Sequence, residues 1–208
     1  MRMTTAMPHP LRRLRTPALL ALGALSLSAC VSFGGKAPPF LLTLDSDVAP
    51  VVGEARSAGE AQTLTILIPN APQKLRTTRI PVQQDDASVA YVKDAQWVEA
   101  PQRLFQRLLS ETVAAKTPLV VLDEGQYLTA PGEQLASQLL EFGVDARTNE
   151  AVVSLQAMRV AAGGKTVTQR RFEVREPIGG KIEAKPVGEA LTRAANKVAA
   201  DVAAWLAG

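Results

Sequence analysis

The chain of 208 residues carries 23 basic and 20 acidic side chains, for a formal net charge of +3, and has one histidine and one cysteine. A single cysteine excludes a disulfide within the chain, and so few histidine and cysteine side chains exclude a zinc site built on them. The length suits one domain with a full hydrophobic core.

The start of the chain has the pattern of an export signal. Residues 1–17 carry four arginines and no acidic side chain, and residues 18–27 are almost all Ala, Leu or Gly. A basic start, a short apolar run and small residues after it are typical of a segment that is removed on export. The apolar run is too short to span a bilayer, which needs about 20 residues. The pair Arg12-Arg13 leaves the twin-arginine export route open as an alternative.

The residues at the end of this segment, Leu27, Ser28, Ala29 and Cys30, resemble the bacterial lipobox. In proteins that carry a lipobox, the cysteine thiol receives a diacylglycerol group, cleavage makes that cysteine the first residue, and its amine is acylated. Three acyl chains on Cys30 would hold the protein firmly to a membrane, because two or more chains give stable anchoring. The alternative is an ordinary signal with a cysteine nearby by chance.

We therefore expect a lipoprotein signal peptide over residues 1–29, a lipid-anchored tether over 30–39 and a single domain over 40–208. The extended tether reaches about 30 Å, at about 3.3 Å per residue. Removing the signal takes away four arginines, which leaves 179 residues with 19 basic and 20 acidic side chains, a net charge of −1. That charge predicts no nucleic-acid partner. The only histidine, His9, is also removed, which excludes a Ser-His-Asp triad or a Cys-His pair, so we expect no enzyme, cofactor or metal site.

Apolar runs and alternation predict several strands in the mature chain. In chain order they cover residues 40–44, 63–68, 79–83, 89–93, 119–122, 152–160 and 166–174. The strand at 63–68 should have one core face, whereas 119–122 is apolar on both faces and should be covered on both sides. The last two strands flank Gly163-Gly164 and should form a hairpin. Asp85-Asp86, with Ser88, should lie in a solvated turn.

Two segments predict helices. Residues 101–116 place apolar side chains at every fourth position, with Pro101 in the first turn and Pro118 just past the end. Residues 187–206 carry apolar side chains at spacings of three and four. Residues 133–144 fit either a helix or a strand. The predicted fold is α/β (α+β), a mixed and mainly antiparallel sheet with two principal helices packed on one face.

Several of these segments together resemble the ABC-type transport auxiliary lipoprotein family. The first is Ile66-Leu67-Ile68-Pro69, followed by Leu75 and Arg79-Ile80. The second is Val89-Ala90-Tyr91, followed by Ala95-Gln96-Trp97 leading into the first helix. The third is Glu141-Phe142, and the last is the C-terminal helix. The motif residues to which we give a structural role are Pro69, Leu75, Arg79, Ile80, Tyr91 and Trp97.

The resemblance implies a periplasmic domain on a lipid anchor, beside an ABC permease and ATPase and an MCE-domain protein that carry lipids or other hydrophobic molecules between two membranes. It also implies that residues 133–147 form a long strand. Lipoproteins with Asp after the lipidated cysteine tend to stay in the inner membrane. Here Val31 follows Cys30, which implies the periplasmic face of the outer membrane.

Alternative interpretations stay open at this point. The protein could assist the assembly of an outer-membrane protein, or carry lipid in a cavity of its own.

Single residues also allow more than one interpretation. Trp97 is either a packing residue or a partner contact. The arginines at 170, 171 and 175 are solvated, or blunt a sheet edge, or meet anionic headgroups or an acidic partner. The pair Asp123-Glu124 should be solvated. A homo-oligomer is possible, since small residues on the last helix permit close approach.

Overall fold

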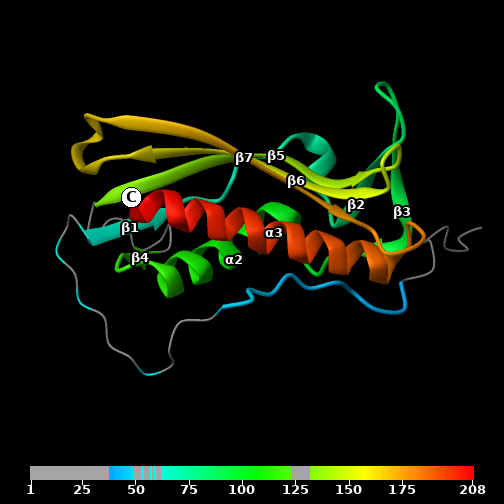
Figure 1. The fold of residues 1–208 in the computed structure, drawn as a ribbon, viewed down its shortest axis with the longest axis horizontal. Coiled ribbons are helices and arrows are strands. Elements are labelled where there is room, and N and C mark those ends of the chain that lie inside the picture. The colour runs from blue at the N-terminus through cyan, green and yellow to red at the C-terminus, as the bar shows by residue number, and fades with distance from the viewer. Residues whose placement is uncertain (1–37, 49–52, 54–56, 58, 60–61, 123–131) are drawn as a thin grey trace, which may run out of the picture. The chain divides into compact units, whose positions relative to one another are not determined.

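The computed structural model describes residues 38–48, 53, 57, 59, 62–122 and 132–208. Within them a seven-stranded mixed sheet packs against two long helices (Figure 1), which confirms the predicted α+β class. The elements are β1 (Thr63–Ile66), η3 (Gln73–Leu75), β2 (Arg79–Gln83), β3 (Val89–Gln96), α2 (Pro101–Lys116), β4 (Val120–Leu122), β5 (Glu133–Asp145), β6 (Glu150–Val160), η5 (Ala162–Gly164), β7 (Val167–Pro177) and α3 (Ala184–Ala207).

β5 is the strand that the other strands share. One edge of β5 pairs in parallel with β1 near its start and with β2 near its end, and β4 and β3 continue the sheet beyond these two. The other edge pairs antiparallel with β6, and β7 follows β6. The long strand implied for residues 133–147 and the predicted hairpin around Gly163-Gly164 are therefore both confirmed.

The two helices cover one face of the sheet. α2 has the predicted bounds, and its apolar stripe is buried, with Leu104, Phe105 and Leu108 fully enclosed. α3 packs on β6 and β7 and runs beside α2 (Figure 1). Its buried side is rich in alanine, which lets it lie close to the strands. Neither described helix combines the length and the apolar character needed to cross a bilayer.

The segment predicted as a first strand is instead a strap on the helical layer. Of residues 40–44, Leu42 alone forms a bridge, with Trp97, and no strand results. Asn196 of α3 accepts a hydrogen bond from the Asp47 N–H at 2.8 Å and donates one to the Asp45 carbonyl at 3.0 Å. The prediction was wrong because the pairing is limited to Leu42, whose N–H donates to the Gln96 carbonyl at 2.8 Å and whose carbonyl accepts from the Val98 N–H at 2.9 Å. The side chain of Leu44, within the strap, is buried.

The burial of β1 and β4 is the reverse of what we predicted. All four residues of β1 are buried, whereas the three residues of β4 are only half-buried. β1 lies between β4 and β5, so a neighbouring strand covers each of its edges. β4 pairs with β1 alone among the described residues, so an apolar run expected to be covered on both sides lies at a sheet edge.

Gly143 gives a direct test of how closely β5 and β2 pack. A Cβ atom added there would lie 2.5 Å from the Pro81 carbonyl oxygen and 2.8 Å from its Cγ. We expect Gly143→Ala to lower the free energy of unfolding by about 1–3 kcal/mol, because the clash is with backbone. Urea denaturation measures the change. Gly179→Ala is the matched control, since no atom lies within 4 Å of its added Cβ. Equal midpoints for the two variants would contradict this packing.

Candidate functional site

The face of β5, β6 and β7 turned away from α3 gathers polar side chains, and we call it the outer face. Phe172 of β7 packs against Trp205 of α3, with ring centroids 5.8 Å apart. Alternation along the strand therefore points Arg171 and Glu173 to the opposite side. By register the outer face comprises Glu141, Gly143 and Asp145 of β5, Val152 and Ser154 of β6, and Arg171, Glu173 and Arg175 of β7.

Two surface depressions meet on the outer face. The first has a volume of about 240 Å³ and is lined by residues that include Asp145, Arg147 and Arg175. The second, of about 620 Å³, extends past η3 toward Arg171. Lys74 of η3 and Glu141 of β5 line both, and their ion pair of 2.7 Å marks the boundary. We call the two adjoining depressions together the trough; its lining mixes charged side chains, which gather at the Asp145 end, with polar and apolar ones.

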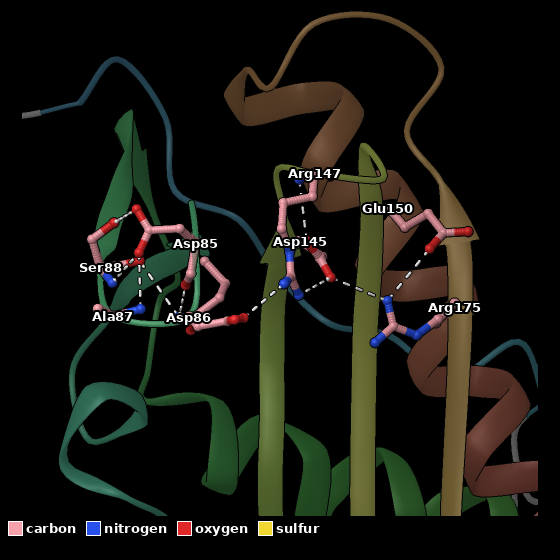
Figure 2. A network of polar contacts seen from close by, with 9 residues as sticks. Asp85, Asp86, Ala87, Ser88, Asp145, Arg147, Glu150 and Arg175 are labelled. Carbon is pink, nitrogen blue, oxygen red and sulfur yellow. Dashed lines mark hydrogen bonds and ion pairs between the residues drawn. The ribbon is translucent and has the colours of Figure 1, made fainter.

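A buried carboxylate organises one end of the trough (Figure 2). The side chain of Asp145 is 8% exposed and accepts hydrogen bonds from Arg147 Nε at 3.0 Å and Nη2 at 3.1 Å. It also accepts from the Arg147 backbone N–H at 3.1 Å and from Arg175 Nη1 at 3.3 Å. These bonds, led by those from the Arg147 side chain, outweigh burial and lower the pKa of Asp145 to about 2.

The same network extends to the β2–β3 turn (Figure 2). Arg147 Nη1 donates to Asp86 at 2.8 Å, although the Asp86 side chain is 96% exposed. Asp85 fixes the turn by accepting from the Ser88 hydroxyl and from the Ala87 and Ser88 backbone N–H groups, and these bonds lower its pKa. The predicted turn is confirmed, but Asp86 is ion-paired as well as solvated.

This arrangement suits recognition by charge. Two arginines hold Asp145 ionised at neutral pH, so its carboxylate fixes their positions. The side chains of Arg147 and Arg175 are about half exposed, at 51% and 43%. Over the described ranges, no three His, Cys, Asp or Glu side chains are placed to share a metal ion. The site can therefore offer a partner both signs of charge on a rigid sheet.

The family-motif residues lie apart from the outer face network. Pro69, Leu75, Ile80 and Trp97 are buried, and Trp97 is only 1% exposed. The Arg79 guanidinium lies 3.9 Å from the centroid of the Tyr91 ring, across the β2–β3 ladder. The lipobox residues Leu27, Ser28 and Ala29, together with Cys30, lie outside the described residues.

Sequence reasoning named Arg175 but missed Asp145 and Arg147. The sequence did carry a signal for this pair: Asp145, at the end of β5, and Arg147, in the turn that follows, are opposite charges two positions apart. Arg175 belongs with them because the β5–β6 and β6–β7 registers place it two strands from β5, level with Gly143, and its long side chain reaches Asp145 diagonally. That placement requires knowing that residues 133–145 form a strand.

Asp145 should make the stability of the protein sensitive to acid. Its folded-state pKa of about 2 lies below 3.8, the ordinary value for an aspartate, so its contribution to stability is present above about pH 4 and is lost as the pH falls toward 2. We expect Asp145→Asn to lower the free energy of unfolding at neutral pH by about 1–2 kcal/mol, after allowing for the half-exposed arginines.

Urea unfolding at a series of pH values measures this effect. The difference in stability between the unaltered protein and Asp145→Asn should shrink between pH 4 and pH 2. Asp201→Asn, at an exposed position on α3, is the control for loss of a carboxylate. Parallel pH profiles for the unaltered protein and Asp145→Asn would contradict the assignment.

The sequence matches a known protein family, and the fold is similar to that of solved structures. The family model described as the ABC-type transport auxiliary lipoprotein component matches residues 43–203. Among curated proteins, none matches the sequence. The fold is similar to that of protein XCC0632 from Xanthomonas campestris, with 17% identity, a TM-score of 0.68, and coverage of 81% of this chain and 94% of that one.

Two further solved structures resemble the chain. An uncharacterized protein has 13% identity and a TM-score of 0.61, covering 73% of this chain and 96% of that one. A PelC dodecamer from Paraburkholderia phytofirmans has 12% identity and a TM-score of 0.45, covering 76% of this chain and 96% of that one. Because the family model spans most of the domain, this chain belongs to the ABC-type transport auxiliary lipoprotein component family.

Proposed function

We propose that this protein is a lipid-anchored docking subunit of an ABC-type transport system, held at the periplasmic face of the outer membrane. It acts by binding an MCE-domain protein that works with the ABC permease and ATPase to move lipids or other hydrophobic molecules. The family match over residues 43–203 is the observation that carries this proposal.

The anchor in this proposal is Cys30, within the lipobox Leu27, Ser28, Ala29 and Cys30. The tether between Cys30 and the domain is short, with a reach of about 30 Å, so the domain works close to the membrane. The chain enters the described domain on its helical side, where Leu42 lies against Gly188 of α3. The outer face is on the other side of the sheet, which leaves it accessible to a partner.

The character of the outer face supports docking more than lipid carriage. An acyl chain is bound in an apolar cavity, whereas the Asp145 end of the trough is lined by Lys74, Glu141 and other charged side chains. Charged groups in fixed positions favour a protein partner with the complementary pattern. The ion pairs of Asp145 keep the arginines at that end of the trough in place before the partner binds.

The anchor is tested by separating the membranes of cells that express the full chain. We expect the unaltered protein with the outer membrane and Cys30→Ser lost from that fraction, because no acyl chain holds it. Val31→Asp should move the protein to the inner membrane in a host that uses this sorting rule. Recovery of the unaltered protein with the inner membrane would contradict the proposed location.

Docking is tested with the purified periplasmic part of an MCE-domain protein from the same organism. Removing the shared ion pair of the trough, in the double variant K74A/E141A, should weaken binding by about tenfold or more. The double variant K185A/E189A is the matched control, because it removes an exposed pair of opposite charges from α3. Equal binding by the two variants would place the partner elsewhere, and failure of the unaltered domain to bind would contradict MCE docking itself.

A further inference from the structure

Half of the large apolar side chains that are exposed in the described part of the chain gather around Leu42 of the strap. Phe40 and Leu41, which are 48% and 50% exposed, directly precede Leu42. The Val98 side chain is 42% exposed, and the Val98 N–H donates to the Leu42 carbonyl at 2.9 Å. The remaining three belong to other segments and are Ile68, Val89 and Val167. We call Phe40, Leu41 and Val98 the entry patch, and such a gathering indicates a binding surface.

Contacts on both sides of Leu42 hold the entry patch in place. The Leu42 N–H donates to the Gln96 carbonyl at 2.8 Å, next to the end of β3. A Cβ atom added at Gly188 of α3 would lie 2.8 Å from Leu42 Cδ2, so the leucine side chain uses the space that the glycine leaves open. The patch is therefore displayed beside the first turns of α3, where the strap begins (Figure 1).

We propose that the entry patch inserts into the bilayer that holds Cys30, so that the domain itself contacts the membrane. This inference rests on the proposed anchor. Phe40 is ten positions after Cys30, and an extended chain at about 3.3 Å per residue separates the two by at most about 33 Å. A short tether gives the patch an effective concentration in the millimolar range at its target, so weak insertion is enough.

The size of the entry patch suits a bilayer better than a protein partner. A stable protein interface uses about 20–30 residues on each side, whereas the patch has three exposed apolar side chains. Apolar side chains of segments that lie at a membrane surface enter about 5–10 Å into the boundary between headgroups and acyl chains. Insertion of this kind needs no matching surface, so a few side chains held close to the bilayer can provide it.

The charges beside the entry patch largely offset one another. Lys185 and Glu189 of α3 border the same depression as Leu41, of about 440 Å³, and their charged groups lie 4.0 Å apart. Arg193, which also borders it, pairs with Glu176 at 3.4 Å. Apolar insertion, rather than attraction to anionic lipid, therefore drives the contact, and a zwitterionic bilayer should suffice.

Insertion and partner binding use different faces of the domain. The entry patch belongs to the strap on the helical layer and to the residue that is bonded to it, whereas the trough lies on the outer face. A domain held to the bilayer by this patch keeps its trough free for the transport partner. The membrane contact thus adds an orientation to the tethering that Cys30 alone would provide.

Fluorescence quenching on vesicles tests the insertion. The chain from Cys30 onward is suitable, because the described hydrophobic core lies entirely within the compact unit 38–208. Cys30 is the only cysteine, so a maleimide lipid in phosphatidylcholine vesicles couples to that residue alone. Phe40→Trp places an indole in the entry patch, and the same chain with Phe40 retained gives the background from Trp97 and Trp205. We expect a blue shift of the added indole on coupling and its quenching by bromine atoms on the upper acyl chain, because insertion reaches about 5–10 Å.

Second substitutions in the Phe40→Trp chain show whether the patch acts as a unit. Val98→Asp should abolish the quenching, because it places a charge among the inserting side chains. Val89→Asp is the matched control and should leave the quenching unchanged, since Val89 is as exposed as Val98 but begins β3. In a separate chain, Val167→Trp places the indole beside the β6–β7 turn, at the other end of the domain from the start of the strap, and should stay unquenched (Figure 1).

Several results would overturn the inference. They are an unquenched indole at position 40, equal quenching at position 167, and quenching that persists with Val98→Asp. A blue shift at position 40 that grows with protein concentration in the absence of vesicles would also overturn it, because a second copy would then cover the patch. The maleimide supplies the anchor in every sample, so these outcomes do not depend on whether Cys30 is lipidated in cells, which the membrane separation tests.

Discussion

The bulge at Leu140 in β5 is the constraint on which the rest of the structure depends. The register against β6 shifts between Leu139 and Glu141, so Leu140 is the extra residue. Before the bulge, Leu135 and Leu139 are the buried positions, and after it Phe142 and Val144 are buried. The bulge thus reverses which residues face the helices. Without it, alternation would turn Glu141 toward α2 and α3 and Phe142 toward solvent.

Phe142 shows what this reversal achieves. Its ring meets Trp97 edge-on at 5.6 Å and Phe105 of α2 at 6.4 Å, and all three rings are buried. These contacts join the residue just after β3, the second turn of α2 and the later part of β5. Between the parts of β5 that pair with β1 and β2, Asn70 continues the edge through hydrogen bonds with Ser137 and Leu139. One strand therefore unites two groups of strands and the helical layer.

The bulge also explains what the sequence could and could not predict. Leu135, Leu139 and Phe142 are spaced by four and three residues, as on a helix, because the reversal of facing breaks the strict alternation of a strand. The family resemblance resolved that ambiguity, whereas periodicity alone did not.

α2 and the β6–β7 hairpin were predictable from the sequence because their hydrophobic patterns are regular. Pro101 marks the start of α2, and Gly163-Gly164 mark the turn of the hairpin. The strap was missed because its partners are distant in sequence: Asn196, about 150 positions away, bonds Asp45 and Asp47, and Leu42 bonds Gln96 and Val98. The pairing of Asp86 with Arg147 was missed because it too joins residues far apart in sequence.

Within the described domain the strap lies on the helical layer and the trough on the outer face, so the sheet separates the two. That separation requires the two groups of strands on β5 to behave as one rigid body, and native-state hydrogen exchange tests this most directly. We predict that the amides of β1, β2 and β5 open with the same free energy, equal to that of global unfolding. If β1 and β4 exchanged through a separate opening of lower free energy than β2 and β3, β5 would not unite the domain, and this account would be contradicted.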